Sequence, residues 1–218
     1  MSKGRSHWRV KICLQRLKLH PVQQFRVLFM SKRKKQEWLK ETLELKENHN
    51  WKSKPGTRIF VAGRGAVRFD VPDDWHFEPD TKSFRFTDKK PPDDDCCLEV
   101  SFNLLPPGNW AEFPLAPLLK KVAEEDSRNP FDMGEIIQLK RQTARIVWTE
   151  FKFIDPPEQR EAYSRICVGL GSNVQCLITF DYWVDDAERL TPVWDTVMES
   201  LVLGLFISDP RTGFARPD

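Results

Sequence analysis

The sequence predicts an α+β fold in which an antiparallel sheet is covered by helices. Residues 144–185 have the pattern of three long strands in succession, and the last of them alternates between apolar and polar side chains. Segments 115–122 and 187–203 each place apolar side chains along one face of a helix. Strands and helices do not alternate one by one, so the sheet is expected to be antiparallel.

The alternating strand, 174–184, indicates a sheet that is buried at least on one face. Leu177 and Trp183 are apolar exceptions on its polar face. Residues 146–153 carry apolar side chains on both faces, and covering helices on both sides would explain this. Earlier short strands are expected at 59–62, 66–71, 84–87, 98–104 and 135–141.

Two local features leave alternatives open. Pro192 either begins the last helix, with Thr191 as N-cap, or kinks it, and Gly204 is a candidate for the residue after that helix. A two-residue turn at Gly171–Ser172 would place Cys167 opposite Cys176. We favour a three-residue loop, 171–173, because it pairs Ile166 with Ile178 and keeps the apolar faces together.

The charge distribution divides the chain. The first 58 residues carry sixteen Lys and Arg against four acidic residues, so the remainder is net negative although the whole chain is +2. We expect a basic, partly helical or disordered arm over 1–56, a domain over 57–206 and a loose tail over 207–218. Translation starting at Met1 or at Met30 fits the sequence equally.

The compartment is expected to be cytoplasmic. The five cysteines are odd in number and show no disulfide or zinc spacing, so free thiols in a reducing environment are expected. The sequence contains no run of about 18 apolar residues, so no membrane span is expected. Residues 1–29 lack acids and are rich in Lys and Arg, which leaves organelle targeting as a second possibility.

The segment AVRFDVPDDW at 66–75 is a strand that ends in Pro and then Trp. Short strands, a helix, a long meander and a C-terminal amphipathic helix with Glu199-Ser200-Leu201 follow it. In this order residues 58–205 resemble the PsbP-like α/β/α sandwich superfamily. That family includes a photosystem II extrinsic subunit, a nuclear transport factor that binds a small GTPase, and bacterial envelope lipoproteins. The resemblance implies binding or assembly roles without shared catalytic residues.

No catalytic, cofactor or metal site is predicted. His76 beside Asp73 and Asp74 is the one candidate for a metal-dependent enzyme, but adjacent acids are ordinary turn residues. The glycines at Gly63–Gly65 and Gly169–Gly171 do not precede helices, as a dinucleotide site requires.

The function predicted is therefore non-enzymatic protein binding or complex assembly. Trp110, in a Pro/Gly loop, and Trp183, on a polar strand face, are the candidate partner-binding aromatics. The alternative is nucleic-acid association through the basic arm, in which Lys32, Arg33, Lys34 and Lys35 would meet phosphates and Trp8, Trp38 and Trp51 would stack on bases. The acidic domain argues against this alternative.

Overall fold

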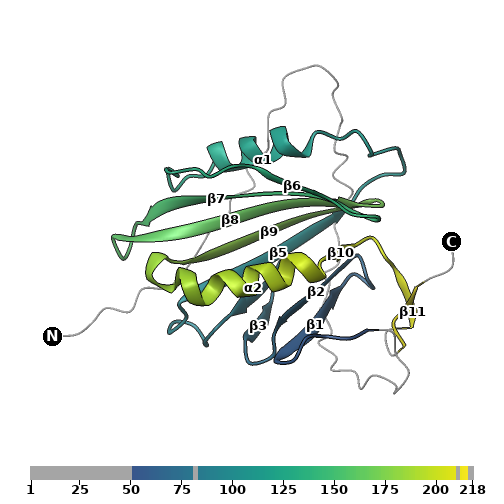
Figure 1. Cartoon of the computed structure of the whole chain (residues 1–218), viewed down its shortest axis with the longest axis horizontal. Helices are drawn as coiled ribbons and strands as arrows, with labels where there is room; N and C mark the ends of the chain where they lie inside the picture. Colours follow the sequence, from purple (N-terminus) through teal and green to yellow (C-terminus); the bar gives the residue numbers. More distant parts are fainter. Residues whose placement is uncertain (1–50, 81–82, 210–211, 216–218) are drawn as a thin grey trace.

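The computed structural model describes residues 51–80, 83–209 and 212–215. A seven-stranded antiparallel sheet runs through the middle of this described part (Figure 1). Its strands, in spatial order, are β3 (His76–Pro79), β4 (Phe84–Thr87), β5 (Cys96–Leu104), β9 (Val174–Trp183), β8 (Arg160–Gly171), β7 (Arg145–Asp155) and β6 (Ile137–Lys140).

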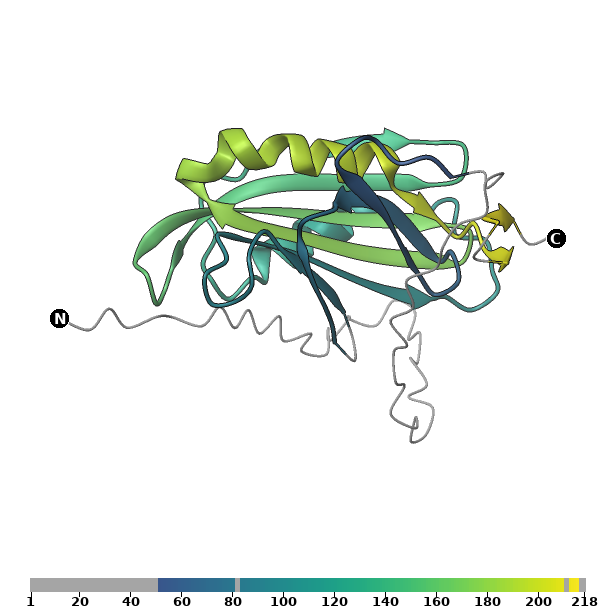
Figure 2. The same ribbon diagram turned by 90° about the horizontal axis from the view of Figure 1, so that it is seen from below.

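Each face of the large sheet has its own cover. Helix α2 (Ala187–Ser200) lies along one face, after the short 3-10 turn η1 (Val184–Asp186) (Figure 2). A small sheet joins α2 there, made of β1 (Thr57–Ala62), β2 (Val67–Pro72) and β10 (Val202–Leu203). Helix α1 (Leu115–Glu124) covers the other face over β7 and β8. The α+β fold class is therefore confirmed.

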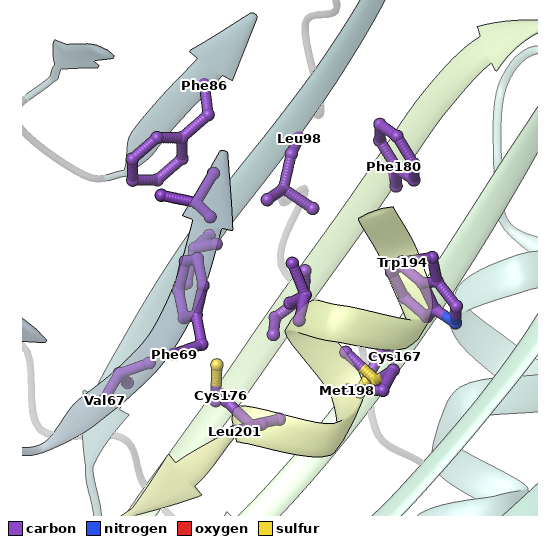
Figure 3. Packing of buried hydrophobic residues seen from close by; sticks show 14 of the residues in the cluster. Val67, Phe69, Phe86, Leu98, Cys167, Cys176, Phe180, Trp194, Met198 and Leu201 are labelled. Carbon is purple, nitrogen blue, oxygen red and sulfur yellow. The ribbon is translucent and has the colours of Figure 1, made fainter. Parts of the chain in front are cut away.

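The apolar face of β9 packs under α2, as its alternation predicts. Phe180 and Trp194 are fully buried, and their rings stack with centroids 6.2 Å apart. Figure 3 shows these rings in one core with Met198 and Leu201 of the α2 region. On the opposite face of the sheet a second core forms around Leu119 of α1. Two cores explain why the central strands are apolar on both sides.

The expected register of the β8–β9 hairpin is wrong. The structure pairs Gly171 with Val174 across a two-residue turn, and Cys167 therefore lies opposite Ile178. Ile166 faces the α1 core instead of the α2 core. The two turn residues are Ser172 and Asn173, so neither expected pairing forms. The three-residue loop would keep Ile166 on the same face as the apolar side chains of β9. Because both faces of the sheet are buried, placing Ile166 on the opposite face does not expose it to water. The four described cysteines are free, as expected.

Helix α2 begins at Ala187, as expected, and Pro192 lies in its interior, which excludes the alternative that Pro192 begins the helix. Thr191 accepts a hydrogen bond from Arg165 rather than capping the helix. The end of α2 differs from the expectation. The helix ends at Ser200, so Gly204 does not terminate it. Gly204 follows β10 with φ +70° and donates its N–H to the Ala66 carbonyl. A strand pairing has taken the place of the last expected helical turn.

Described residues on both sides of the expected domain also make contacts in the structure. Trp51 is 8% exposed, lies under the guanidinium of Arg68 and packs against Gly213, so a residue assigned to the arm belongs to the folded body. Strands β11 (Ile207–Asp209) and β12 (Phe214–Ala215) pair with each other, so the described part of the expected loose tail is ordered. No strand was expected at β3, where most side chains are exposed and no apolar alternation is present.

Candidate functional site

A groove of about 690 Å³ opens at one end of the large sheet. Three connections form it: the β6–β7 turn, the β8–β9 turn and the loop that leads into α1. The residues that line it are Pro107, Gly108, Asn109, Trp110, Ala111, Glu112, Lys140, Arg141, Gln142, Thr143, Ala144, Arg145, Leu170, Gly171, Ser172 and Asn173.

Trp110 is half-buried in this groove and is fixed in place by its own loop. Its indole Nε1 donates a hydrogen bond to the Pro106 carbonyl at 3.0 Å. Its ring meets that of Phe113 edge to face, with centroids 5.9 Å apart. The Asn109 side chain accepts the Ala111 N–H, which tightens the same loop. The loop therefore presents an ordered aromatic ring that a partner can cover without first ordering it.

Two arginines fasten the walls of the groove. Arg145 donates through Nη2 to the carbonyls of Trp110 at 2.8 Å and Phe113 at 3.0 Å, so β7 holds the Trp110 loop. Arg141 donates to carbonyls at the end of α2, those of Met198, Glu199 and Leu201. These carbonyls are orphan acceptors of the helix terminus, where a cation is favourable.

The groove is a cationic region of an acidic domain. Lys140, Arg141 and Arg145 line it together with one acid, Glu112. The residues after Arg58 have a net charge of about −10, since the first 58 carry sixteen of the 34 basic and four of the 32 acidic residues. The local charge thus has the opposite sign to the body, which favours acidic groups in a bound molecule. Neither arginine was singled out in the sequence, because their roles depend on contacts across the fold.

The structure separates the two predicted tryptophans. Val174 begins β9 beside the groove, whereas Trp183 ends that strand, so Trp110 and Trp183 lie at opposite ends of β9. Trp183 is 5% exposed in the α1 core, with the Arg160 guanidinium 4.6 Å from its ring centroid. The fold therefore covers the Trp183 ring, and its role in partner binding remains a prediction. Lys32, Arg33, Lys34 and Lys35 lie outside the described residues.

His76, Asp73 and Asp74 lie in and beside the turn between β2 and β3, and all three are exposed. Within residues 51–80, 83–209 and 212–215, no three His, Cys, Asp or Glu side chains form a metal-binding group. The same described part of the chain has no helix long and apolar enough to cross a membrane.

A polar cluster that the sequence did not reveal lies beneath the α1 side of the sheet. Arg128 donates to Asp181 at 2.9 Å and to Asp126 at 2.6 Å, while Ser164 donates to Asp181 at 2.6 Å. The guanidinium also lies 4.1 Å from the ring centroid of Phe153. Asp181 is 3% exposed and the Arg128 side chain 12%, so the cluster is enclosed and its role is structural.

The described thiols are poor nucleophiles. Burial raises the pKa of the Cys96, Cys97 and Cys167 thiols well above the usual range, and it does the same for Cys176. Since the thiolate is the reactive form, we expect these four cysteines to alkylate slowly with iodoacetamide at pH 8 and rapidly after unfolding in urea. Peptide mapping by mass spectrometry separates them from Cys13. Rapid labelling of any of the four in the native chain would contradict this expectation.

Comparison with known proteins places this chain in a family. Over 192 residues the chain is 66% identical to the uncharacterised protein alr1449 of Nostoc sp. (strain PCC 7120), covering 87% of this chain and all of the relative. The solution structure of the cyanobacterial PsbP (CyanoP) of Synechocystis sp. PCC 6803 matches with a TM-score of 0.50 at 11% identity. The match covers 69% of this chain and 94% of that one, and it supports a PsbP-like fold. The Alr1449 family model matches residues 58–207, and the chain therefore belongs to the Alr1449 family.

Proposed function

We propose that this domain is a non-enzymatic protein-binding or complex-assembly module, and that the groove around Trp110 is its binding site. The fastened, partly buried ring of Trp110, which packs against the edge of the α1 core, carries the proposal. Tryptophan is over-represented among residues that dominate binding energy, particularly where it is ordered before the partner arrives. The PsbP-like fold agrees with this assignment, since the resemblance to that superfamily implies binding and assembly roles.

The two arginines of the groove support a binding role in preference to a catalytic one. Arg145 is engaged with the loop carbonyls, and Arg141 is engaged with the end of α2. A catalytic acid, base or nucleophile has to be positioned toward a substrate, whereas these side chains are positioned toward the backbone. They fix the shape of the groove and leave the Trp110 ring and the net positive charge for a partner.

Replacing Trp110 by alanine is expected to weaken capture of the native partner by about tenfold, because the anchor is lost while the backbone that Arg145 holds remains. The measurement compares quantitative mass spectrometry of proteins retained by the wild-type full chain and by the Trp110→Ala chain in native cell extract. Ile154→Ala is the matched control, since Ile154 is 39% exposed and lies at the far end of β7 from the groove. Equal retention of the same proteins by all three chains would refute the groove as the binding site.

The sixteen basic residues of the first 58 favour one second candidate, nucleic-acid association through the arm. In the same experiment, nuclease treatment separates the two functions. Release of the retained proteins by nuclease, together with their loss when Lys32, Arg33, Lys34 and Lys35 are replaced by glutamine, would assign binding to the arm. Retention that survives nuclease and depends on Trp110 would assign it to the groove.

A further inference from the structure

Strand β6 leaves one backbone edge of the large sheet open. It is the outermost strand, and within the described ranges no strand pairs with its outer side. The Arg141 N–H donates to the Ala144 carbonyl at 2.8 Å, so these two residues form a hydrogen-bonded pair. In the antiparallel register of β6 and β7, every second residue of β6 from Arg141 backward therefore bonds to β7. Leu139 and Ile137 then direct their backbone groups toward β7, and Gln138 and Lys140 direct theirs outward.

Exposed apolar side chains flank this edge on the face that α2 also covers. Ile137 pairs with Trp148 and is 39% exposed. Phe131 bridges to Lys152 on β7 and is 41% exposed. Residues that lie directly opposite each other on neighbouring strands share a face of the sheet. Trp148 and Lys152 are four residues apart on β7 and share a face, so Ile137 and Phe131 lie on that same face. Met133, between them in sequence, is 41% exposed as well. Clustered exposure of this kind marks an interaction surface.

The open edge leads directly into the groove. β6 runs from Ile137 to Lys140, and Lys140 is itself one of the lining residues. A strand laid antiparallel along β6 would therefore begin in the groove and continue past Ile137. Its first residues would meet the positive charge of Lys140, Arg141 and Arg145.

We propose that a partner protein binds by adding an extended segment as an antiparallel strand to β6, with acidic residues at its amino-terminal end in the groove and apolar side chains beside Ile137. Outward backbone groups provide the hydrogen bonds, and alternate side chains provide selectivity. The inference rests on the proposed function and specifies the mode of binding. The charge of the groove disfavours the chain's own basic arm as the occupant.

The test uses the full chain and a fluorescent, acetylated probe peptide in which a few Asp and Glu residues precede alternating Val and Thr. Gln138→Pro removes one outward N–H without removing a bond to β7, and proline is tolerated at a sheet edge. Gln138→Val is the matched control, because it changes the same side chain and keeps the N–H. Far-ultraviolet circular dichroism and melting curves establish that both variants fold.

Fluorescence anisotropy is expected to show probe binding by the wild-type and Gln138→Val chains, and affinity about tenfold lower for Gln138→Pro. A probe with Lys in place of Asp and Glu should bind more weakly. Equal binding by the two Gln138 variants, or no binding to the wild-type chain, would overturn strand addition. Neither result would decide whether the groove binds a partner, because the Trp110→Ala capture experiment tests that separately. A wild-type dimer in sedimentation that Gln138→Pro dissociates would assign the edge to a second copy and overturn the partner strand.

Discussion

Replacing Arg128 by methionine is expected to lower the free energy of unfolding by about 3–5 kcal/mol, because it leaves a buried carboxylate without its cation. Asp181 is 3% exposed and receives hydrogen bonds from Arg128 at 2.9 Å and Ser164 at 2.6 Å. Only the serine bond would remain in the variant. Urea denaturation followed by tryptophan fluorescence measures the loss, and a change below about 1 kcal/mol, typical of an exposed ion pair, would contradict it.

The pH dependence of this loss has a definite sign. Burial raises the pKa of Asp181, and Arg128 opposes that shift. Without Arg128 the folded-state pKa rises further, while the unfolded value stays near about 4. Between these two values the folded chain binds more protons than the unfolded one, so the stability of the variant falls as pH rises through that window. The deficit relative to wild type is therefore expected to be smaller at pH 5 than at pH 7.

The double variant Arg128→Met/Asp181→Asn supplies the control. Asparagine has nearly the shape of aspartate but carries no charge, so the double variant should be more stable than Arg128→Met alone at pH 7. Its deficit should also change little between pH 5 and pH 7. If the double variant is as unstable as the single one at both pH values, the loss comes from the contact of the Arg128 guanidinium with the Phe153 ring and the charge argument is wrong.

Replacing Gly171 by alanine is expected to cost about 3 kcal/mol of folding free energy, at the upper end of the range for overpacking. An added methyl carbon would lie 2.7 Å from Leu203 Cβ, 2.7 Å from the Leu203 carbonyl oxygen and 2.8 Å from the Thr143 carbonyl oxygen. Two of these contacts are backbone atoms in different segments, so no side-chain rotation relieves the overlap. Thermal unfolding by calorimetry measures the change.

Gly108→Ala is the matched control for this substitution. Gly108 also lines the groove, but a methyl carbon there would lie 3.7 Å from its nearest neighbour, Trp110 Nε1, which is ordinary contact. Its effect is expected to remain within about 0.5 kcal/mol. Similar losses in the two variants would indicate that groove glycines act through chain flexibility, and the close approach of β8 to Leu203 would then not be the cause.

Local patterns in the sequence were sufficient for the α+β class, for both helices and for the strands of the large sheet other than β3. Apolar periodicity is a property of neighbouring residues, so β9 and α1 were visible without tertiary information. The resemblance of residues 58–205 to the PsbP-like superfamily was carried by the order of elements, and the family match over residues 58–207 coincides with it. Trp110 was found as an aromatic residue in a Pro/Gly loop.

Only the tertiary structure decided which residues meet. The β8–β9 register followed from burial on both faces and from the contact of Gly171 with Leu203, a residue 32 positions later in the chain. The same holds for Trp51 against Gly213, for Arg128 with Asp181 and for Arg145 with the Trp110 loop. These contacts join segments that are distant in sequence, and their energies depend on burial and geometry that no local pattern encodes. The sequence by itself determined most of the elements and their order. The packing of those elements formed the groove in which we propose that a partner binds.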